Sequence, residues 1–349
     1  MTTQQSTEPE PTRLVWHNAL DIGIEGKGWK DTIDPFDRIP AKAEAVVRKA
    51  IWHMKRSSTG MCLRFRTSAE EIHARWEIEG NGLGEANFNR CAHSGLDLYG
   101  DDHGTWKWVG ATQNFDSYQP EVCIIKGLDG EERDYLLYLP LRNKLISLEV
   151  GVPVHVVFTG LPPRTQPPIL VYGSSIVQGA YASRCGMVYP SILGRRLQLP
   201  ILNLGFSGNA IMEPELAELF GELEVSAYIL DPMPNMDLQM VEERTAAFIL
   251  RLKELKPHTP IVMIGDFQRT NNWALTEERT SLQKKIDLCR NIVEDLISSG
   301  IEGLSFIEGE SLLGDDHEAS IDGIHPGDVG FLRMAQNIEQ HLKQVLNIS

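Results

Sequence analysis

The sequence predicts an α/β protein whose second half forms a parallel sheet, preceded by a domain of antiparallel strands. Two observations support the parallel sheet. Five short apolar runs alternate with helical segments after residue 168, namely ILVYG (169–173), PILNLGF (200–206), SAYILDP (226–232), PIVMIGD (260–266) and GLSFIEG (303–309). In residues 237–256, which separate two of these runs, Val241, Phe248, Leu252 and Leu255 fall on one helical face. Five such repeats predict a parallel sheet with helices on both faces.

The first half has a different pattern, with short segments of alternating or clustered apolar residues. The clearest are LRFRT (63–67), RDYLLYLPL (133–141) and KLISLEV (144–150). They predict half-buried strands of a β-sandwich-like domain. Residues 41–54 are ambiguous between helix and strand, and we favour a strand from Val46 at a sandwich edge. We therefore expect a flexible tail (1–12), a β-sandwich-like domain (13–160), a Pro-rich linker (161–168) and an α/β domain (169–349).

Composition narrows the class of protein. The 349 residues are 42% hydrophobic and 23% charged, which is typical of a globular protein. A formal net charge of -15 argues against nucleic-acid and anionic-membrane partners and suits a neutral substrate. No apolar run approaches the ~20 residues of a membrane span, and the N-terminus lacks the pattern of a secretory signal. Five scattered cysteines without a CxxC pair favour reduced thiols in the cytoplasm.

Ser175 is the first candidate for chemistry. It follows the apolar run 169–173 and precedes Gly179, so it lies at a tight turn where a nucleophile would be exposed. Helix capping is the structural alternative, since serine is a common N-cap. Ser174 and Ser207 are competing serines at similar positions.

The run IDGIHPGDVG (321–330) supplies Asp322 and His325, three residues apart. At this spacing the carboxylate can reach the imidazole within one turn, fix its tautomer and leave the other nitrogen free to act as a base. The structural alternatives are a loop histidine bonded to a backbone carbonyl for His325 and a cap of the helix that begins near Val329 for Asp322. With Ser175, the pair predicts the nucleophile, base and orienting acid of a serine hydrolase.

Two polar insertions at strand ends predict hydrogen-bond donors for an oxyanion. Gly208 lies in NLGFSGN (203–209) and Asn235 in LDPMPNM (230–236). A backbone N–H from Gly208, the side-chain amide of Asn235 and the N–H of Ser175 would surround one oxygen atom. Each residue alone is equally compatible with a plain turn.

In this order, the four sites resemble the SGNH (GDSL-type) hydrolase superfamily over about residues 168–345. The resemblance implies a three-layer, flavodoxin-like sheet, with Ser175, Gly208, Asn235 and His325 as the motif residues and Asp322 completing the triad. Two positions depart from the family pattern. Ser174 stands where the GDS motif has aspartate, and Met236 stands where GxND has a second aspartate.

A second resemblance concerns the first half. SGLDLYG (94–100), followed by WKWVG (106–110), is similar to the GxDLY motif of a domain that precedes some SGNH esterases, carbohydrate O-deacetylases in particular. For Tyr99 and Trp106 themselves, stacking on a ligand and burial in the core are both open, with the core favoured.

The remaining candidates carry less chemistry. The GDDH runs at 100–103 and 314–317 lack a second His or Cys at ligand spacing, so we predict solvated turns and no metal. No GxGxxG or P-loop indicates nucleotide binding. Trp273 follows the fourth predicted strand and is a candidate to line a substrate pocket or to pack beneath a loop.

The predicted function is therefore a cytoplasmic serine esterase that removes short acyl groups, acetyl in particular, from sugars or oligosaccharides through an acyl-enzyme. No cofactor is expected, the partner is a small acylated carbohydrate, and a homo-oligomer is compatible with the sequence. Two alternatives stay open. One is a lipid or acyl-thioester hydrolase of the same superfamily, and the other is a non-catalytic carbohydrate-binding protein.

Overall fold

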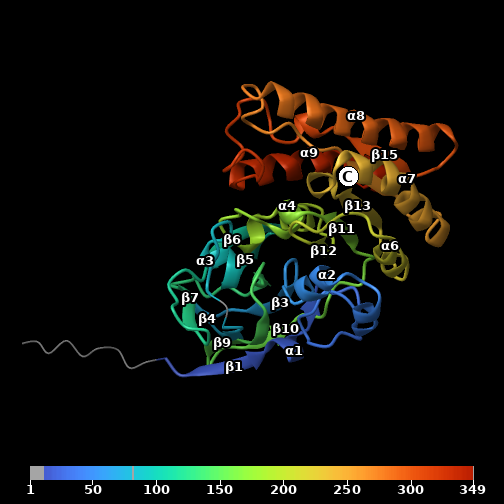
Figure 1. Cartoon of the computed structure of the whole chain (residues 1–349). Coiled ribbons are helices and arrows are strands. Elements are labelled where there is room, and N and C mark those ends of the chain that lie inside the picture. Colours follow the sequence, from blue (N-terminus) through green and yellow to red (C-terminus); the bar gives the residue numbers. More distant parts are fainter. Residues whose placement is uncertain (1–11, 81, 349) are drawn as a thin grey trace, which may run out of the picture.

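The computed structural model describes residues 12–80 and 82–348, so the predicted tail lies outside the described residues except for Thr12. Figure 1 shows the antiparallel strands of the first half below, and the parallel sheet with its long C-terminal helices above.

Two antiparallel sheets form the N-terminal domain. The first has the order β1-β9-β4-β7, with β1 (Leu14–Asn18), β9 (Leu145–Pro153), β4 (Glu71–Ile78) and β7 (Glu121–Lys126). The second has the order β10-β3-β8-β5-β6, with β2 paired to β3, and its strands are β10 (Phe158–Gly160), β3 (Cys62–Thr67), β8 (Arg133–Tyr138), β5 (Asp97–Asp102), β6 (Thr105–Ala111) and β2 (Ile24–Glu25). Phe65 and Leu137 of one sheet share a buried cluster with Ala74, Trp76 and Val150 of the other. The predicted sandwich-like arrangement is confirmed.

Residues 41–54 are not a strand, so our expectation of one from Val46 is wrong. They form a 3₁₀ helix, η1 (Ala41–Ala45), and the helix α2 (Lys49–Met54). Ile51 is fully buried in a cluster that also contains Leu204 and Phe206 of the second half. The segment therefore packs on the other domain instead of extending a sheet, and this tertiary contact outweighs its β-branched residues. The domain also contains α1 (Ala19–Ile22) and α3 (Arg90–Ser94).

The second half contains the predicted parallel sheet. Its strands are β11 (Ile169–Gly173), β12 (Ile201–Gly205), β13 (Ala227–Asp231), β14 (Ile261–Ile264) and β15 (Leu304–Ile307), in the order β12-β11-β13-β14-β15. All pairings are parallel, and Gly173 is in register with both Gly205 and Asp231. This is the flavodoxin-like strand order, in which ligands bind where the order reverses, beyond the carboxyl ends of the central strands.

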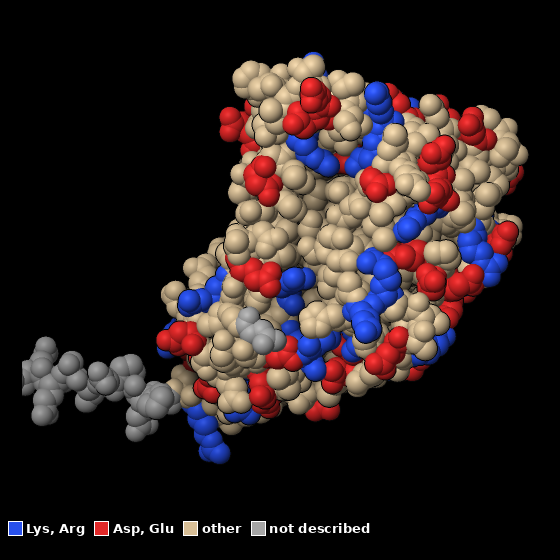
Figure 2. Space-filling view, in the orientation of Figure 1, with Lys and Arg blue, Asp and Glu red and all other residues tan. Residues whose placement is uncertain are grey.

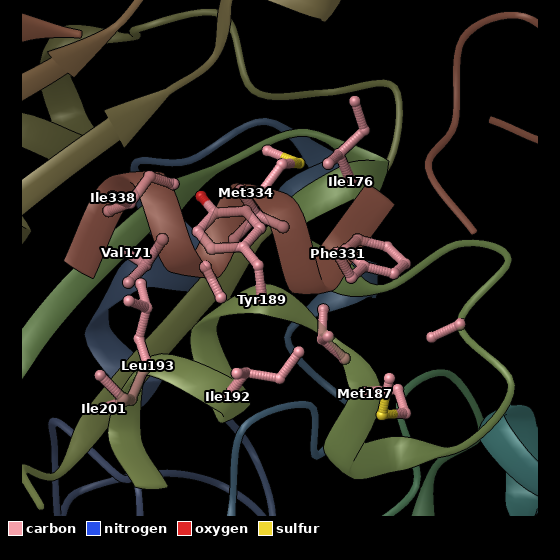
Figure 3. Close-up of a cluster of buried hydrophobic side chains, with 14 of the residues drawn as sticks. Val171, Ile176, Met187, Tyr189, Ile192, Leu193, Ile201, Phe331, Met334 and Ile338 are labelled. Carbon is pink, nitrogen blue, oxygen red and sulfur yellow. The ribbon is translucent and has the colours of Figure 1, made fainter. Parts of the chain in front are cut away.

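Helices cover both faces of this sheet. They are α4 (Ser175–Gln178), α5 (Tyr189–Arg196), α6 (Pro214–Gly221), α7 (Leu238–Leu255), α8 (Thr276–Ser298) and α9 (Asp328–Leu346), with 3₁₀ turns η2 (Cys185–Met187), η3 (Met233–Asn235) and η4 (Gly309–Ser311). Side chains alternate along β11, so that Val171 belongs to a buried cluster with residues of α5 and α9, while the Tyr172 ring contacts Phe220 of α6 and Phe248 of α7. Figure 3 shows this buried cluster, in which Leu193 of α5 and Ile338 of α9 lie beside Val171.

The predicted amphipathic helix is confirmed in α7, where Val241, Phe248 and Leu252 are buried and Leu255 is half-buried. No helix in the described part of the chain is long and apolar enough to cross a membrane. All five cysteines are unpaired. On the face shown in Figure 2, acidic and basic side chains are interspersed around an uncharged centre.

The Pro-rich segment 161–168 joins β10 to β11 without forming a helix or strand. Arg164 within it pairs with Glu25 on β2, with Nη2 2.5 Å from Oε1. This segment is therefore held against the N-terminal domain. The exact domain limits stay a prediction.

Candidate active site

Ser175, His325 and Asp322 lie in series at the carboxyl edge of the parallel sheet. Ser175 Oγ is 2.8 Å from His325 Nε2, although the two residues are 150 positions apart. His325 Nδ1 is 2.8 Å from Asp322 Oδ2. A carboxylate that accepts from Nδ1 leaves Nε2 as the acceptor for a hydroxyl proton. We refer to this chain of hydrogen bonds as the Ser175–His325–Asp322 relay.

Asp322 is oriented by its own turn. Its Oδ1 accepts hydrogen bonds from the amides of Ile324 (3.0 Å) and His325 (2.8 Å). Partial burial would raise the pKa of this carboxyl, but the hydrogen bonds from the His325 amide, its ring and the Ile324 amide outweigh burial and lower the pKa. Asp322 is therefore ionised at neutral pH. It does not cap the following helix, because α9 begins at Asp328 with Gly327 as N-cap.

The structure separates Ser175 from its two competitors. Ser174 is the N-cap of α4, and its Oγ accepts from the Ile176 amide at 3.2 Å. Ser207 lies in the loop after β12, where its amide donates to Gln178 Oε1 at 3.0 Å. Ser175 is the first helical residue, and it is the serine of these three whose hydroxyl lies beside His325 Nε2.

The sharp turn at Ser175 depends on close packing between α4 and the neighbouring strand. A Cβ at Gly205, the last residue of β12, would lie 2.3 Å from the Gln178 nitrogen. Only glycine allows this approach, so the sequence NLG at the strand end permits the position of the serine turn.

Gly208 and Asn235 follow the two strands that flank β11. Gly208 has φ +69°, in the left-handed region that favours glycine. Asn235 ends the 3₁₀ turn η3, and its Oδ1 accepts from the Ala210 amide at 3.2 Å. This bond ties the loop after β12 to the loop after β13. Because it uses the side-chain oxygen, the N–H groups of Nδ2 remain as the donors that an oxyanion requires.

Tyr181 is a neighbour of the relay that sequence reasoning missed. Its ring centroid is 5.5 Å from that of His325, at an interplanar angle of 46°. The residue has φ +66°, and its amide donates to the carbonyl of Asn87 in the N-terminal domain at 2.7 Å. No feature of the sequence around Tyr181 signals a left-handed tyrosine, so this contact could not have been found without the tertiary structure.

A groove of about 730 Å³ opens beside Asp322. Apolar and polar side chains line it, including Leu238, Leu275, Ile324 and Asn271. Trp273 belongs to the same loop after β14 and is 70% exposed, so it is not packed beneath that loop. It is not itself among the residues that line the groove.

The GDDH run at 314–317 lies in a loop as predicted, but the run at 100–103 is not a turn, because Asp101 and Asp102 end strand β5. Both runs contain ion pairs. Asp102 pairs with Lys107, and Asp316 pairs with Arg333. Among the described residues, one group has three metal-ligand side chains within 4.8 Å of one another, namely Glu71, His73 and Cys123. It lies on β4 and β7 of the N-terminal domain, and Lys126 Nζ is 3.2 Å from Glu71 Oε2. This carboxylate therefore already has a cationic partner.

A flavodoxin-like sheet with a serine–histidine–aspartate relay at its carboxyl edge has the architecture of the α/β serine hydrolases. Comparison with protein families specifies the group. Residues 166–343 match the GDSL-like lipase/acylhydrolase family, and residues 14–158 match the GxDLY family, the N-terminus of SGNH-hydrolase-type esterases. The chain belongs to the GDSL-like lipase/acylhydrolase family, and the resemblance stated from the sequence is confirmed for both halves.

Solved structures agree with this assignment. A protein described as a GDSL-like lipase from Bacteroides ovatus is 32% identical, with a TM-score of 0.91, over 97% of this chain and 99% of that one. The salicylyl-acyltransferase SsfX3 from a tetracycline biosynthetic pathway is 18% identical, with a TM-score of 0.73 over 98% of both chains. A family two carbohydrate esterase from Cellvibrio japonicus is 13% identical, with a TM-score of 0.59 over 97% and 99%. The last two share the fold alone. No curated protein matches the sequence.

Proposed function

We propose that this protein is a serine esterase that removes short acyl groups, acetyl in particular, from sugars or oligosaccharides. The observation that carries the proposal is the Ser175–His325–Asp322 relay, with two hydrogen bonds of 2.8 Å each. These are the contacts that a hydroxyl nucleophile, its base and the group that orients the base require.

In the first half of the reaction, Ser175 Oγ attacks the ester carbonyl carbon while His325 Nε2 takes the hydroxyl proton. The ionised Asp322 stabilises the imidazolium that forms. The C–O bond to the sugar then breaks, and His325 returns its proton to the leaving sugar oxygen. An acetyl group remains on Ser175 as the acyl-enzyme.

In the second half, His325 takes a proton from water, and the water oxygen attacks the acyl carbon. The bond to Oγ then breaks, His325 returns the proton to Oγ, and acetic acid is released, which restores the serine hydroxyl and the neutral imidazole. Both halves pass through a tetrahedral oxyanion, for which we propose the N–H groups of Ser175 and Gly208 and the Asn235 amide as donors. Every step uses groups of the chain and water, and we propose that no cofactor takes part.

A carbohydrate substrate is supported by several independent features. Trp273 is 70% exposed on the loop that borders the groove, where an indole ring could stack on a sugar. The net charge of -15 suits a neutral substrate better than a phosphorylated one. Family two carbohydrate esterases share the fold, and one such structure, from Clostridium thermocellum, is a complex with cellohexaose.

Five unpaired cysteines fit a reducing compartment, and we propose the cytoplasm.

A lipid or acyl-thioester substrate is the second candidate, and three exposed apolar side chains of the groove favour it. Leu238 is 46% exposed, Leu275 38% and Ile324 40%, and all three line the groove beside Asp322. Such side chains could hold a longer acyl chain, at about 0.8 kcal/mol for each buried methylene.

Acyl-chain length separates these candidates. We expect kcat/KM to fall steeply from acetyl to octanoyl p-nitrophenyl esters, and acetate to be released from acetylated oligosaccharides. A rise across the series would favour the lipid substrate and reject the carbohydrate one. Absence of turnover on every ester, together with binding of oligosaccharides, would instead indicate a non-catalytic carbohydrate-binding protein.

A further inference from the structure

An arginine of the N-terminal domain makes hydrogen bonds to the loop that carries Gly208. Residues 206–213 connect β12 to α6, and we call them the 206–213 loop. Arg48, the residue before α2, donates from Nη1 to Asn209 Oδ1 at 3.0 Å and from Nη2 to the Asn209 carbonyl at 2.9 Å. Its Nε donates to Glu213 Oε1 at the far end of the loop. One planar guanidinium therefore fixes two points of the loop at once.

The first contact controls the direction of the Gly208 N–H. Asn209 Nδ2 donates to the Ser207 carbonyl at 2.9 Å, while Asn209 Oδ1 accepts from Arg48. The Ser207 carbonyl and the Gly208 N–H belong to one trans peptide plane and point in opposite directions. Holding the carbonyl therefore aims the N–H, and Arg48 orients the side chain that holds it.

The second contact controls the side chain of Asn235. The Asn209 carbonyl, which accepts from Arg48 Nη2, shares a peptide plane with the Ala210 N–H. That N–H donates to Asn235 Oδ1 at 3.2 Å and so determines where Nδ2 points. Both candidate oxyanion donors outside Ser175 are thus connected to one guanidinium, each through two hydrogen bonds.

The base of the 206–213 loop is held from the same side. Arg38 is fully buried, and its Nη1 donates to the carbonyls of Gly205 (2.7 Å) and Asn203 (3.2 Å) on β12. Its guanidinium lies 4.8 Å from the centroid of the Phe206 ring. Because Arg38 is completely enclosed, its removal would disturb the core. The Arg48 side chain is 41% exposed and is therefore the better probe.

We propose that Arg48 is a positioning residue for the oxyanion hole, supplied by the N-terminal domain. The inference rests on the proposed esterase function. Arg48 acts through the 206–213 loop, which aligns the Gly208 and Asn235 donors. Displacing an aligned group by about 1 Å can cost on the order of 100-fold in rate. An indirect effect through two donors is expected to be of that size or smaller.

The test compares Arg48→Ala and Arg48→Lys with wild type on p-nitrophenyl acetate. We expect kcat to fall about 10- to 100-fold in both variants with KM little changed, because the donors act on the transition state more than on bound substrate. The lysine variant retains a cation for Glu213 but not the planar fork that reaches Asn209, so charge alone should not rescue kcat.

Lys42→Ala is the matched control. Lys42 lies in the same segment and makes an exposed ion pair with Glu222 of the second half, at 2.7 Å. Within the described residues, no hydrogen bond or ion pair joins it to the 206–213 loop. Its removal should leave kcat unchanged. A kcat loss in Lys42→Ala equal to that in the Arg48 variants would show that the segment merely holds the two halves together, and would overturn the inference.

A double-mutant comparison tests the route through Asn209. The kcat losses of Arg48→Ala and Asn209→Ala should combine to less than their product, since both act on the same peptide planes. Full multiplication of the two losses, or a near-normal kcat in Arg48→Lys, would reject the positioning role. If Arg48→Ala does not fold, the lysine variant decides the outcome. Failure of the wild type to turn over any ester would reject the proposed function instead, so the two failures are distinguishable.

Discussion

The two halves of this protein bury their strands differently, and the candidate chemistry follows that difference. Every residue of β11, β12 and β13 is buried, because helices cover both faces of the parallel sheet. In β4 of the N-terminal domain, buried residues such as Trp76 alternate with less buried ones such as Arg75. A sheet covered on both faces leaves functional side chains only its strand ends, which lie together at one edge. The sandwich has outer faces instead, and none of the relay residues comes from it.

The N-terminal domain nevertheless holds the segments around the relay. Asp97 of the GxDLY-like motif accepts from Arg184 Nη1 (2.9 Å), the Gly186 amide (2.7 Å) and Trp108 Nε1 (3.0 Å). Arg184 and Gly186 lie in the stretch between α4 and α5, just after the serine turn. Tyr99 is buried, as the sequence favoured, beneath the Arg195 guanidinium at 3.9 Å. The motif therefore joins the two domains, which predicts that its loss affects stability more than chemistry.

Removing the proposed nucleophile should have the largest effect on activity, with little effect on stability. Ser175→Ala is expected to lower kcat by roughly 10⁴-fold or more, and His325→Ala by a similar factor, because the members act as a unit. Thermal unfolding should be little changed. Activity assays beside melting curves check this. Near-normal turnover in Ser175→Ala, with Ser174 or Ser207 essential instead, would contradict the assignment.

Loss of one oxyanion donor should have the next largest effect. Asn235→Ala is expected to lower kcat by roughly 10²- to 10³-fold with KM little changed, since the amide would act on the developing charge. Steady-state kinetics measure both constants. Gln239→Ala on the exposed start of α7 is the control and should match wild type. A rise in KM without loss of kcat would assign Asn235 to ground-state binding.

A substitution in the N-terminal domain should instead affect stability and leave kcat largely unchanged. Asp97→Asn should lower the free energy of unfolding by about 1.5–3 kcal/mol, the usual contribution of a hydrogen bond to a charged group. The kcat of the folded enzyme should be largely retained. Denaturant unfolding checks the first expectation, with the exposed Asp116→Asn as control. A stable Asp97→Asn variant with strongly reduced kcat would contradict a structural role for this residue.

The last expected effect is on the pH dependence of stability rather than on activity, and it concerns Asp231, at the end of β13. Complete burial raises the pKa of its carboxyl from 3.8 to about 8, although Tyr189 Oη donates to it at 3.1 Å. The folded state therefore binds this proton more tightly than the unfolded chain does. Its contribution to stability is fully present below about pH 4 and declines as pH rises towards 8, by up to ~1.4 kcal/mol per pH unit.

Asp231→Asn should flatten this decline, because the amide does not ionise. Unfolding free energies measured from pH 4 to 9 for both proteins provide the test. An unchanged pH dependence in the variant would assign the titration to another group.

The parallel sheet could be predicted from the amino-acid pattern, because five apolar runs that alternate with helical segments are typical of parallel strands covered by helices. It could also be predicted that Ser175, Gly208 and Asn235 lie at one edge of the sheet, since parallel strands bring the residues after their carboxyl ends together there. The Asp322 and His325 pair was readable for a more local reason, as both belong to one turn. The helix over residues 49–54 was not predicted, because its stability comes from packing against the other domain rather than from the helix propensity of its residues.

Tertiary packing was needed to show which serine hydroxyl lies beside the His325 ring and which contacts fix the surrounding loops. Ser174 and Ser175 are adjacent in sequence, and only the placement of α4 makes one an N-cap and the other the partner of His325. The contact of Arg48 with Asn209 joins residues 161 positions apart, and that of Asn87 with Tyr181 joins residues 94 positions apart. Such contacts leave no periodic pattern and no fixed residue spacing in the sequence. They arise when two domains pack, and packing depends on the whole shape of both surfaces rather than on any short stretch of the chain.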